Sequence, residues 1–534
     1  MFTKIIYFIL FLLNFNNIYS QEKITLNAHL NSGWYPQDKI SLENDLNFYI
    51  KKAQEVFKLK TDNTQVKVII TPHASYYYSG LCAATSYQTL LNKNIKNSNI
   101  KNVIILCPSH NKSFSGIAIP EYKNFKNILG NIKVNLNNIN KLQENNNFKF
   151  IENVFEAEHA IEIQLPFLQH TIENFEITPL VVGNILERDY KNIADSIKNI
   201  IDNNTLIVIS SDFIHYGLDY GYTPFNIFIL DNIKNTDTQA LYAIGKQSFI
   251  NFSNTIKKTG ATICGQNCIK ILLKLLEQKP FGYIEPRLTC YYTSAQLSQA
   301  RNNYNININK LLADIPDNIF NNIKNSVSYA GLIFTAEKNS LLKEEDQLTE
   351  YEKLSLYNLA KRTISNELQE NKVPVDLLYP VTTISLDKNA GAFVTLEKNG
   401  NLQGCIGRII SNQELYKTVE EMAKVAAFND TRFNPVTKED LENLEISISI
   451  LTQPKSINNY NDIILGKHGI ILKKPTKSGY WTSSVFLPEV PAGLGWNLQK
   501  TLEELSLKAG LDKDAWQQDC NFEVFESFKI KSIL

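Results

Sequence analysis

Residues 21–336 alternate apolar runs with polar stretches of helical periodicity. Three of the apolar runs are rich in β-branched residues and break suddenly into polar loops: VKVIITPHASYYYSG (66–80), VIILCPSHNKSFSG (103–116) and TLIVISSDFIHYG (205–217). Runs of this kind predict strands that are buried on both faces. Their alternation with helices predicts an α/β domain with a mainly parallel central sheet.

Each of these three runs places a histidine just past its last apolar residues. His73 follows the first run, His110 follows the second, and Asp212 and His215 follow the third. Parallel strands bring their carboxyl ends to one edge of the sheet, where open α/β folds bind ligands. We therefore expect these side chains to share one site.

Asp212 and His215 are three residues apart, close enough to touch in a turn. A carboxylate that fixes the tautomer of a neutral imidazole raises its basicity, which suits a general base or a metal ligand. The alternative is a helix-capping aspartate beside a structurally satisfied histidine.

Two further stretches carry candidate chemistry. EAEHAIEIQLPFLQH places Glu158 and Glu162 on one helical face beside His159, and that face could hold a metal, orient a histidine or meet water. ATICGQNCIKILLKLL places Cys264 at the start of an apolar helix, where the helix N-terminus lowers the pKa of a thiol. Two imidazoles and one thiolate would form a three-ligand site usable by iron, copper or zinc, whereas Cys268 is expected in the core.

The second half of the chain has a different pattern. A charged segment at 337–348 predicts a junction, and residues 349–534 mix helices with short strands, which predicts an α+β domain. Asn399 and Gly400 suit a tight hairpin turn. Cys405 lies between two glycines in a predicted flexible loop with Arg408 nearby, so it is either a nucleophile or a buried structural cysteine.

Residues 1–20 have a basic residue, an apolar core and a small terminal residue, as in a secretory signal peptide. This pattern predicts export to the periplasm, the extracellular space or a secretory lumen, and the alternative is an uncleaved anchor. No later stretch has the roughly 20 apolar residues that a membrane-spanning helix needs. The seven cysteines are an odd and sparse set, which does not indicate a disulfide framework.

Composition narrows the class of protein. Hydrophobic residues make up 43% and charged residues 20%, which is typical of globular domains. The 54 basic residues equal the 54 acidic residues, so net charge does not indicate nucleic acid as a partner.

The first half resembles the Memo family. The resemblance is carried by HLNSGWYP, TPHASYYYSG, CPSHNKSFSG, EAEHAIEIQLPFLQ, SSDFIHYG, ATICG, YYTSAQ and SVSYAGL. It implies a fold like that of non-haem iron extradiol dioxygenases, with His73, His110 and Cys264 as metal ligands and with Asp212 and His215 in the same site. The chain departs from the family at Cys107 and Ser75, where the family usually has glycine.

The second half resembles the AMMECR family through GAFVTLEKNGNLQGCIG, AAFNDTRFNPVTKEDLENLEISISILT, GKHGIILKK, FLPEVP and GWNLQKTLEELSLKAGL. The two resemblances together match two parts of the AmmeMemoRadiSam system. They imply a radical-SAM protein as a partner, since the chain itself has no radical-SAM cysteine motif.

These observations favour a metal-dependent oxidoreductase of dioxygenase-like type. Iron or copper would be held by His73, His110 and Cys264, while Asp212 and His215 manage protons. Two alternatives stay open, because one fold hosts many functions. One is a non-catalytic scaffold that binds a small molecule or a peptide, and the other is a copper-binding, metal-handling protein.

Overall fold

The computed structural model describes most of the chain. The described residues are 24–56, 65–91, 99–302, 305–312, 323–336, 348–370, 372–381, 385–475 and 480–531. The predicted signal peptide and nearly all of the predicted junction lie outside them. Among the described residues, no helix is both long and apolar enough to cross a membrane. The chain divides into two compact units, which are described separately below.

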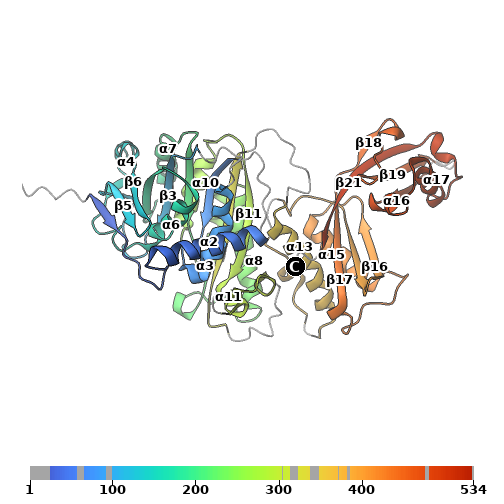
Figure 1. Cartoon of the computed structure of the whole chain (residues 1–534), viewed down its shortest axis with the longest axis horizontal. Helices are drawn as coiled ribbons and strands as arrows, with labels where there is room; N and C mark the ends of the chain where they lie inside the picture. Colours follow the sequence, from blue (N-terminus) through green and yellow to red (C-terminus); the bar gives the residue numbers. More distant parts are fainter. Residues whose placement is uncertain are drawn as a thin grey trace, which may run out of the picture. The chain divides into compact units, whose positions relative to one another are not determined.

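The first unit is built on a large mixed sheet (Figure 1). Its main strand order is β1-β5-β6-β8-β3-β9-β2-β14-β10, with β11 pairing β14 and β4 pairing β8 and β7. The bounds are β1 Thr25–Asn27, β2 Gln65–Thr71, β3 Asn102–Pro108, β4 Ile117–Ile119, β5 Asn124–Asn127, β6 Gly130–Val134, β7 Phe148–Phe150, β8 Glu176–Val182, β9 Thr205–Ser210, β10 His215–Gly217, β11 Ile284–Thr293 and β14 Asn325–Ala336.

The centre of this sheet is parallel. β3 pairs in parallel with β8 on one side and β9 on the other, and β9 pairs in parallel with β2. All residues of β3 and β9 are buried, as expected for β-branched runs covered on both faces. β14 is antiparallel to both β2 and β11. The predicted α/β class with a mainly parallel sheet is confirmed.

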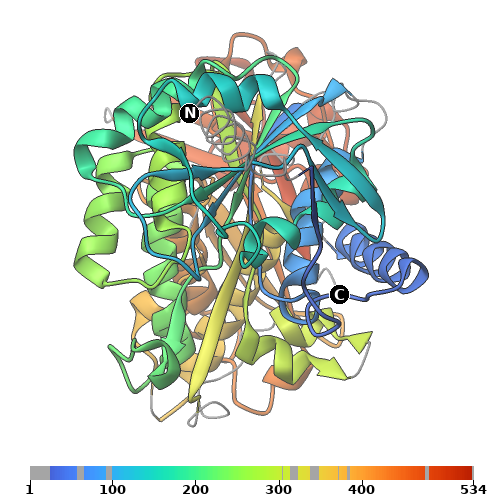
Figure 2. The same ribbon diagram turned by 90° about the vertical axis from the view of Figure 1, so that its left-hand side faces the viewer.

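Helices cover both faces of this sheet, as the end-on view of Figure 2 shows. α2 (Lys39–Val56) packs on α3 (Tyr76–Tyr87), and α3 contacts β2 and β11. α10 (Gln266–Leu276) packs on α7 (Tyr190–Lys198) and contacts β3 and β9. α9 (Phe249–Thr259) contacts α10 as well. The short helices α5 (His159–Glu162) and α6 (Leu165–Thr171) lie in chain order between β7 and β8.

The second unit contains an antiparallel sheet with the order β16-β15-β17-β21-β19-β20, and β18 also pairs β21. The bounds are β15 Ala392–Lys398, β16 Asn401–Arg408, β17 Leu444–Leu451, β18 Lys455–Ile457, β19 His468–Pro475, β20 Trp481–Phe486 and β21 Asn521–Lys531. The predicted hairpin turn joins β15 to β16, with Asn399 and Gly400 both at positive φ.

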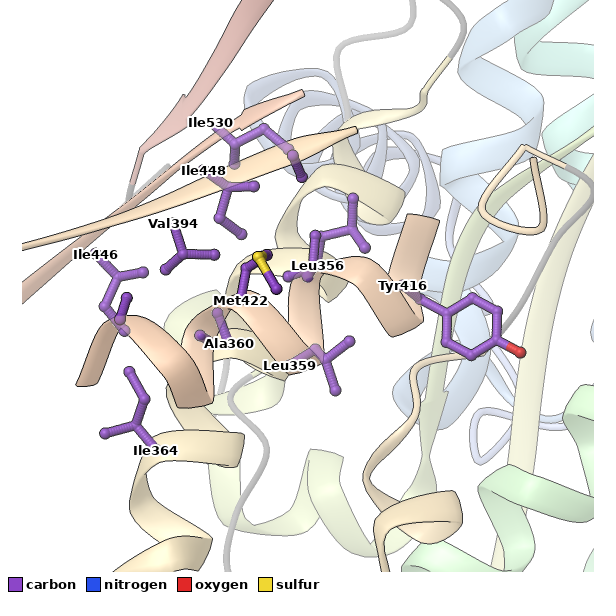
Figure 3. Close-up of a cluster of buried hydrophobic side chains, with 14 of the residues drawn as sticks. Leu356, Leu359, Ala360, Ile364, Val394, Tyr416, Met422, Ile446, Ile448 and Ile530 are labelled. Atoms are coloured by element: carbon purple, nitrogen blue, oxygen red, sulfur yellow. The ribbon is translucent and has the colours of Figure 1, made fainter. Parts of the chain in front are cut away.

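Helices cover this sheet and complete the predicted α+β domain. α13 (Glu350–Glu367) begins with a capping box formed by Thr349 and Glu352. α13 packs on α15 (Leu415–Phe428), and α15 contacts β15 and β16. Their apolar faces form one core cluster with the sheet, in which Met422 lies among Leu356, Ala360 and Val394 (Figure 3). A smaller cluster holds α17 (Leu498–Lys508) against β19 and β21.

The second unit also contains residues from the middle of the chain. Helix α8 (Ile229–Gly245) belongs to it by contacts. Asp231 of α8 forms a buried ion pair with Arg362 of α13, at 2.5 Å. Tyr242 of α8 donates a hydrogen bond to Asp387, at 2.8 Å. The second unit therefore combines the C-terminal half of the chain with a helix from the first half.

Candidate metal site

The carboxyl ends of two strands in the parallel part of the sheet bring His73 and His110 together. His73 follows β2 and His110 follows β3, with β9 between the two strands. The centroids of the two imidazole rings are 5.0 Å apart. The structure thus brings these two predicted ligands together by the mechanism expected from the pattern of the strands.

A third histidine completes the cluster. His159 is the first residue of α5, and its ring centroid lies 4.4 Å from that of His110 and 5.2 Å from that of His73. One ring nitrogen from each of the three histidines lies within 4.8 Å of the others, a grouping that could hold a metal ion. From the sequence, His159 is expected beside Glu158 and Glu162 and is not predicted to be a ligand. The available signal was its position directly after Glu158.

Glu158 organises two of these imidazoles. One carboxylate oxygen lies 2.8 Å from Nδ1 of His110, and the other accepts the main-chain N–H of His110 at 2.8 Å. The first oxygen also lies 3.4 Å from Nδ1 of His159 and accepts the N–H of Ala160 at 3.0 Å. A carboxylate accepts but does not donate when ionised, so Nδ1 of His110 carries a proton, and Nε2 is the nitrogen that holds the lone pair in the neutral ring.

The second predicted acid, Glu162, has a different set of partners. It accepts hydrogen bonds from Tyr35 Oη at 2.6 Å and from the main chain of His29 and Leu30. Nδ1 of His29 also lies 2.9 Å from its carboxylate. Glu162 therefore ties the segment after β1 to α5, while Glu158 serves the histidine cluster.

Burial keeps two of the imidazoles neutral. His73 is only 2% exposed, and its burial, reinforced by the neighbouring His110, holds its pKa well below the usual 6.5. Burial and the same neighbour lower the pKa of His159 to about 4. A neutral imidazole is the form that binds a metal, so both residues are ready to ligate at neutral pH.

Cys264 lies beside this cluster. Its Sγ is 3.2 Å from Nε2 of His73 and accepts the main-chain N–H of Asp212 at 3.1 Å. The prediction that the helix start lowers its pKa is wrong. Burial is the main cause that raises the pKa of this thiol, and the nearby Asp212 carboxylate raises it further. The thiol is therefore protonated at neutral pH without a metal, and ligation would displace its proton.

Asp212 and His215 also lie at the site, each with main-chain partners. Asp212 accepts the N–H of His73 at 2.8 Å. Nδ1 of His215 lies 2.9 Å from the carbonyl oxygen of Phe213 and 3.2 Å from that of Thr262, so it donates, and Nε2 is the acceptor nitrogen of the neutral ring. Burial raises the pKa of Asp212, while the nearby His215 opposes this shift.

Cys405 belongs to the second unit and lies within a strand. It is part of β16 and pairs with Thr395 of β15, so the predicted flexible loop is wrong because the glycines continue the hairpin ladder. Its Sγ lies 3.2 Å from Oγ1 of Thr395, and its N–H donates to Asp430 at 2.9 Å. Arg432 donates to its carbonyl oxygen, whereas Arg408 pairs with Glu421.

The comparisons with known proteins match both halves of the chain. The family model described as Memo-like protein matches residues 27–304. The chain belongs to the Memo family. It also carries an AMMECR1 domain, since that family model matches residues 357–530. Both resemblances found in the sequence are confirmed.

Known proteins are similar to parts of this chain. The Memo domain is similar to the protein memo-1 homolog of Caenorhabditis elegans, with 31% identity over 48% of this chain and 75% of that protein. The chain is also similar to protein Mbar_A1807 of Methanosarcina barkeri, with 34% identity over 34% of this chain and 89% of that protein. The crystal structure of the uncharacterised protein PH0010 of Pyrococcus horikoshii is 31% identical, covering 33% of this chain and 88% of its own, with a TM-score of 0.29.

The residues of the Memo domain suit a transition metal. Three imidazole nitrogens are ligands that zinc, copper and iron share, and a nearby thiol extends the choice toward softer ions. Because Nδ1 of His110 is engaged by Glu158, the ring presents Nε2 as an acceptor without a proton. The lone pair of a neutral imidazole can bind a metal, and the lowered pKa values of His73 and His159 keep these two rings neutral.

Proposed function

We propose that this Memo-family protein is a metal-dependent redox enzyme that resembles non-haem iron dioxygenases. The observation that carries the proposal is the convergence of His73, His110 and His159, whose nitrogens lie within 4.8 Å of one another. His73 and His110 would ligate iron or copper. The third ligand would come from His159 or from Cys264, whose Sγ is 3.2 Å from Nε2 of His73.

A bound iron or copper ion would supply Lewis acidity and one-electron chemistry. The protein supplies the proton handling. His215 is oriented by two carbonyl oxygens, so its Nε2 can accept a proton from a substrate hydroxyl. Asp212 orders the chain at His73 and lies near His215. The proposed substrate is a small molecule with a hydroxyl group that can give its proton to His215.

We also propose that the chain acts within the AmmeMemoRadiSam system after export, with a radical-SAM protein as partner. The supporting observations are the fusion of the two family domains and the signal-peptide pattern of residues 1–20. Sequencing the N-terminus of the native protein tests the export. A native chain that still begins at Met1 would contradict cleavage.

The first test is metal content, measured by mass spectrometry on anaerobically purified full-length protein. We expect near-stoichiometric iron or copper in the wild type, and loss of it in His73→Ala and His110→Ala. His170→Ala is the matched control, because His170 lies on α6 of the same unit outside the histidine cluster. An absence of metal in the wild type, even after reconstitution, would rule out the redox function.

The Cys264 thiol favours a second candidate, which is copper handling. A thiolate is a soft ligand that selects copper(I) among the metals in question. In that case bound copper would exchange readily with a chelator, and the protein would consume no oxygen with any hydroxylated substrate. Oxygen consumption that depends on bound metal would favour the enzyme.

A further inference from the structure

Three buried polar side chains form a chain of hydrogen bonds that begins at His73. Nδ1 of His73 is 3.1 Å from Oγ of Ser210, the last residue of β9. Nε2 of Gln164 donates to the same hydroxyl at 2.9 Å. Tyr87 of α3 donates through its hydroxyl to Oε1 of Gln164 at 2.9 Å. Ser210, Gln164 and Tyr87 are each at most 1% exposed.

The orientation of the Gln164 amide follows from its neighbours. One end faces the carbonyl oxygen of Pro72 at 2.9 Å, and a carbonyl can only accept. That end must therefore be the NH2 group, which also donates to Ser210. The opposite end is the oxygen that accepts from Tyr87.

The proton of the Ser210 hydroxyl is directed away from His73. A serine hydroxyl has one proton and two lone pairs. The proton is directed to the carbonyl oxygen of Ala160 at 2.7 Å, the shortest contact of this hydroxyl. Gln164 occupies one lone pair, and the other faces Nδ1 of His73. Nδ1 must therefore be the donor.

We propose that Gln164 and Ser210 are positioning residues that fix His73 in its Nδ1-protonated tautomer, so that Nε2 presents a lone pair to the metal. This inference rests on the proposed metal site. Nε2 is the atom that faces Cys264 at 3.2 Å, so the tautomer places the acceptor on the side of the cluster. Gln164 acts on His73 through the hydroxyl of Ser210 and is therefore a positioning residue, not a ligand.

The experiment uses the full-length protein and two readouts. The first is the zinc dissociation constant, measured by competition with a chromophoric chelator. Ser210→Ala is expected to weaken zinc binding about 10–100-fold, as loss of an outer-shell partner typically does, and Gln164→Leu is expected to weaken it by a smaller factor. Ser86→Ala is the matched control, because it removes one fully buried hydroxyl on α3 that bonds to Thr289.

The second readout is the nitrogen chemical shifts of His73 in metal-free protein labelled with [15N]histidine, assigned with His73→Ala. The wild type is expected to show the Nδ1-protonated tautomer, and Gln164→Leu is expected to show a mixture of tautomers. An Nε2-protonated His73 in the wild type would overturn the inference, as would zinc binding by Ser210→Ala and Gln164→Leu equal to that of Ser86→Ala. If the wild type binds no metal, the proposed function fails, while the tautomer measurement still decides this inference.

Discussion

Glu158 holds His110 through both oxygens of its carboxylate, one on the main-chain N–H and one on Nδ1 of the ring, each at 2.8 Å. The two residues are 48 positions apart in the chain. Burial raises the pKa of Glu158, but the hydrogen bonds from His110 outweigh this effect and hold the pKa below its usual 4.5. Glu158 therefore positions His110, a proposed metal ligand, and orients its ring.

Replacing Glu158 should weaken metal binding without removing a ligand. We expect Glu158→Ala to lower zinc affinity about 10–100-fold, because His110 loses its acceptor and its main-chain anchor together. Glu158→Gln keeps an acceptor oxygen and should lose less. Chelator competition on the full-length protein measures both variants. Equal affinity in the wild type and Glu158→Ala would show that His110 is held by other contacts.

The third ligand can be identified by spectroscopy of cobalt-substituted protein. We expect a thiolate-to-metal charge-transfer band in the wild type that disappears in Cys264→Ser, because Sγ lies 3.2 Å from a ligand nitrogen. His159→Ala should retain that band and weaken cobalt binding. If the band is absent from the wild type, the three histidines are the ligand set and Cys264 stays a neighbouring thiol.

The stability of the AMMECR1 domain should depend on the buried side chain of Met422. This side chain is 2% exposed and lies between α13 and the sheet (Figure 3). Met422→Ala is expected to lower the free energy of unfolding by about 2–5 kcal/mol, through lost burial and a new cavity. Denaturant unfolding measures the change. Leu507→Ala is the control, because Leu507 is 48% exposed and its truncation should cost less than about 0.5 kcal/mol.

The pair formed by Asp430 and Arg432 should make the stability of the AMMECR1 domain depend on pH. Arg432 and the N–H of Cys405 hold the pKa of Asp430 well below its usual 3.8. A lowered pKa in the folded state adds stability above the usual value, and this stability is lost as the pH falls below 3.8. Asp430→Asn should therefore be less stable than the wild type at neutral pH.

The difference between the two proteins should shrink toward about pH 3, because protonation removes the same charge from the wild type. Urea unfolding at several pH values measures both proteins. Arg432→Gln should give the same trend, since it removes the other partner of the pair. A stability difference that does not change with pH would show that the pair contributes through packing alone.

The sequence by itself determined the two family domains, their fold classes and the meeting of His73 with His110. Apolar β-branched runs fix which segments become buried strands, and parallel strands necessarily share one carboxyl edge. Tertiary structure alone decided the place of His159, because a four-residue helix is oriented by the long-range contact of Glu158 with His110. It also decided the state of Cys264, because desolvation depends on what packs around the thiol and here outweighs the helix terminus. The local pattern of apolar and polar residues predicts where strands end. Burial, and contacts between residues distant in sequence, exist only once the chain has folded.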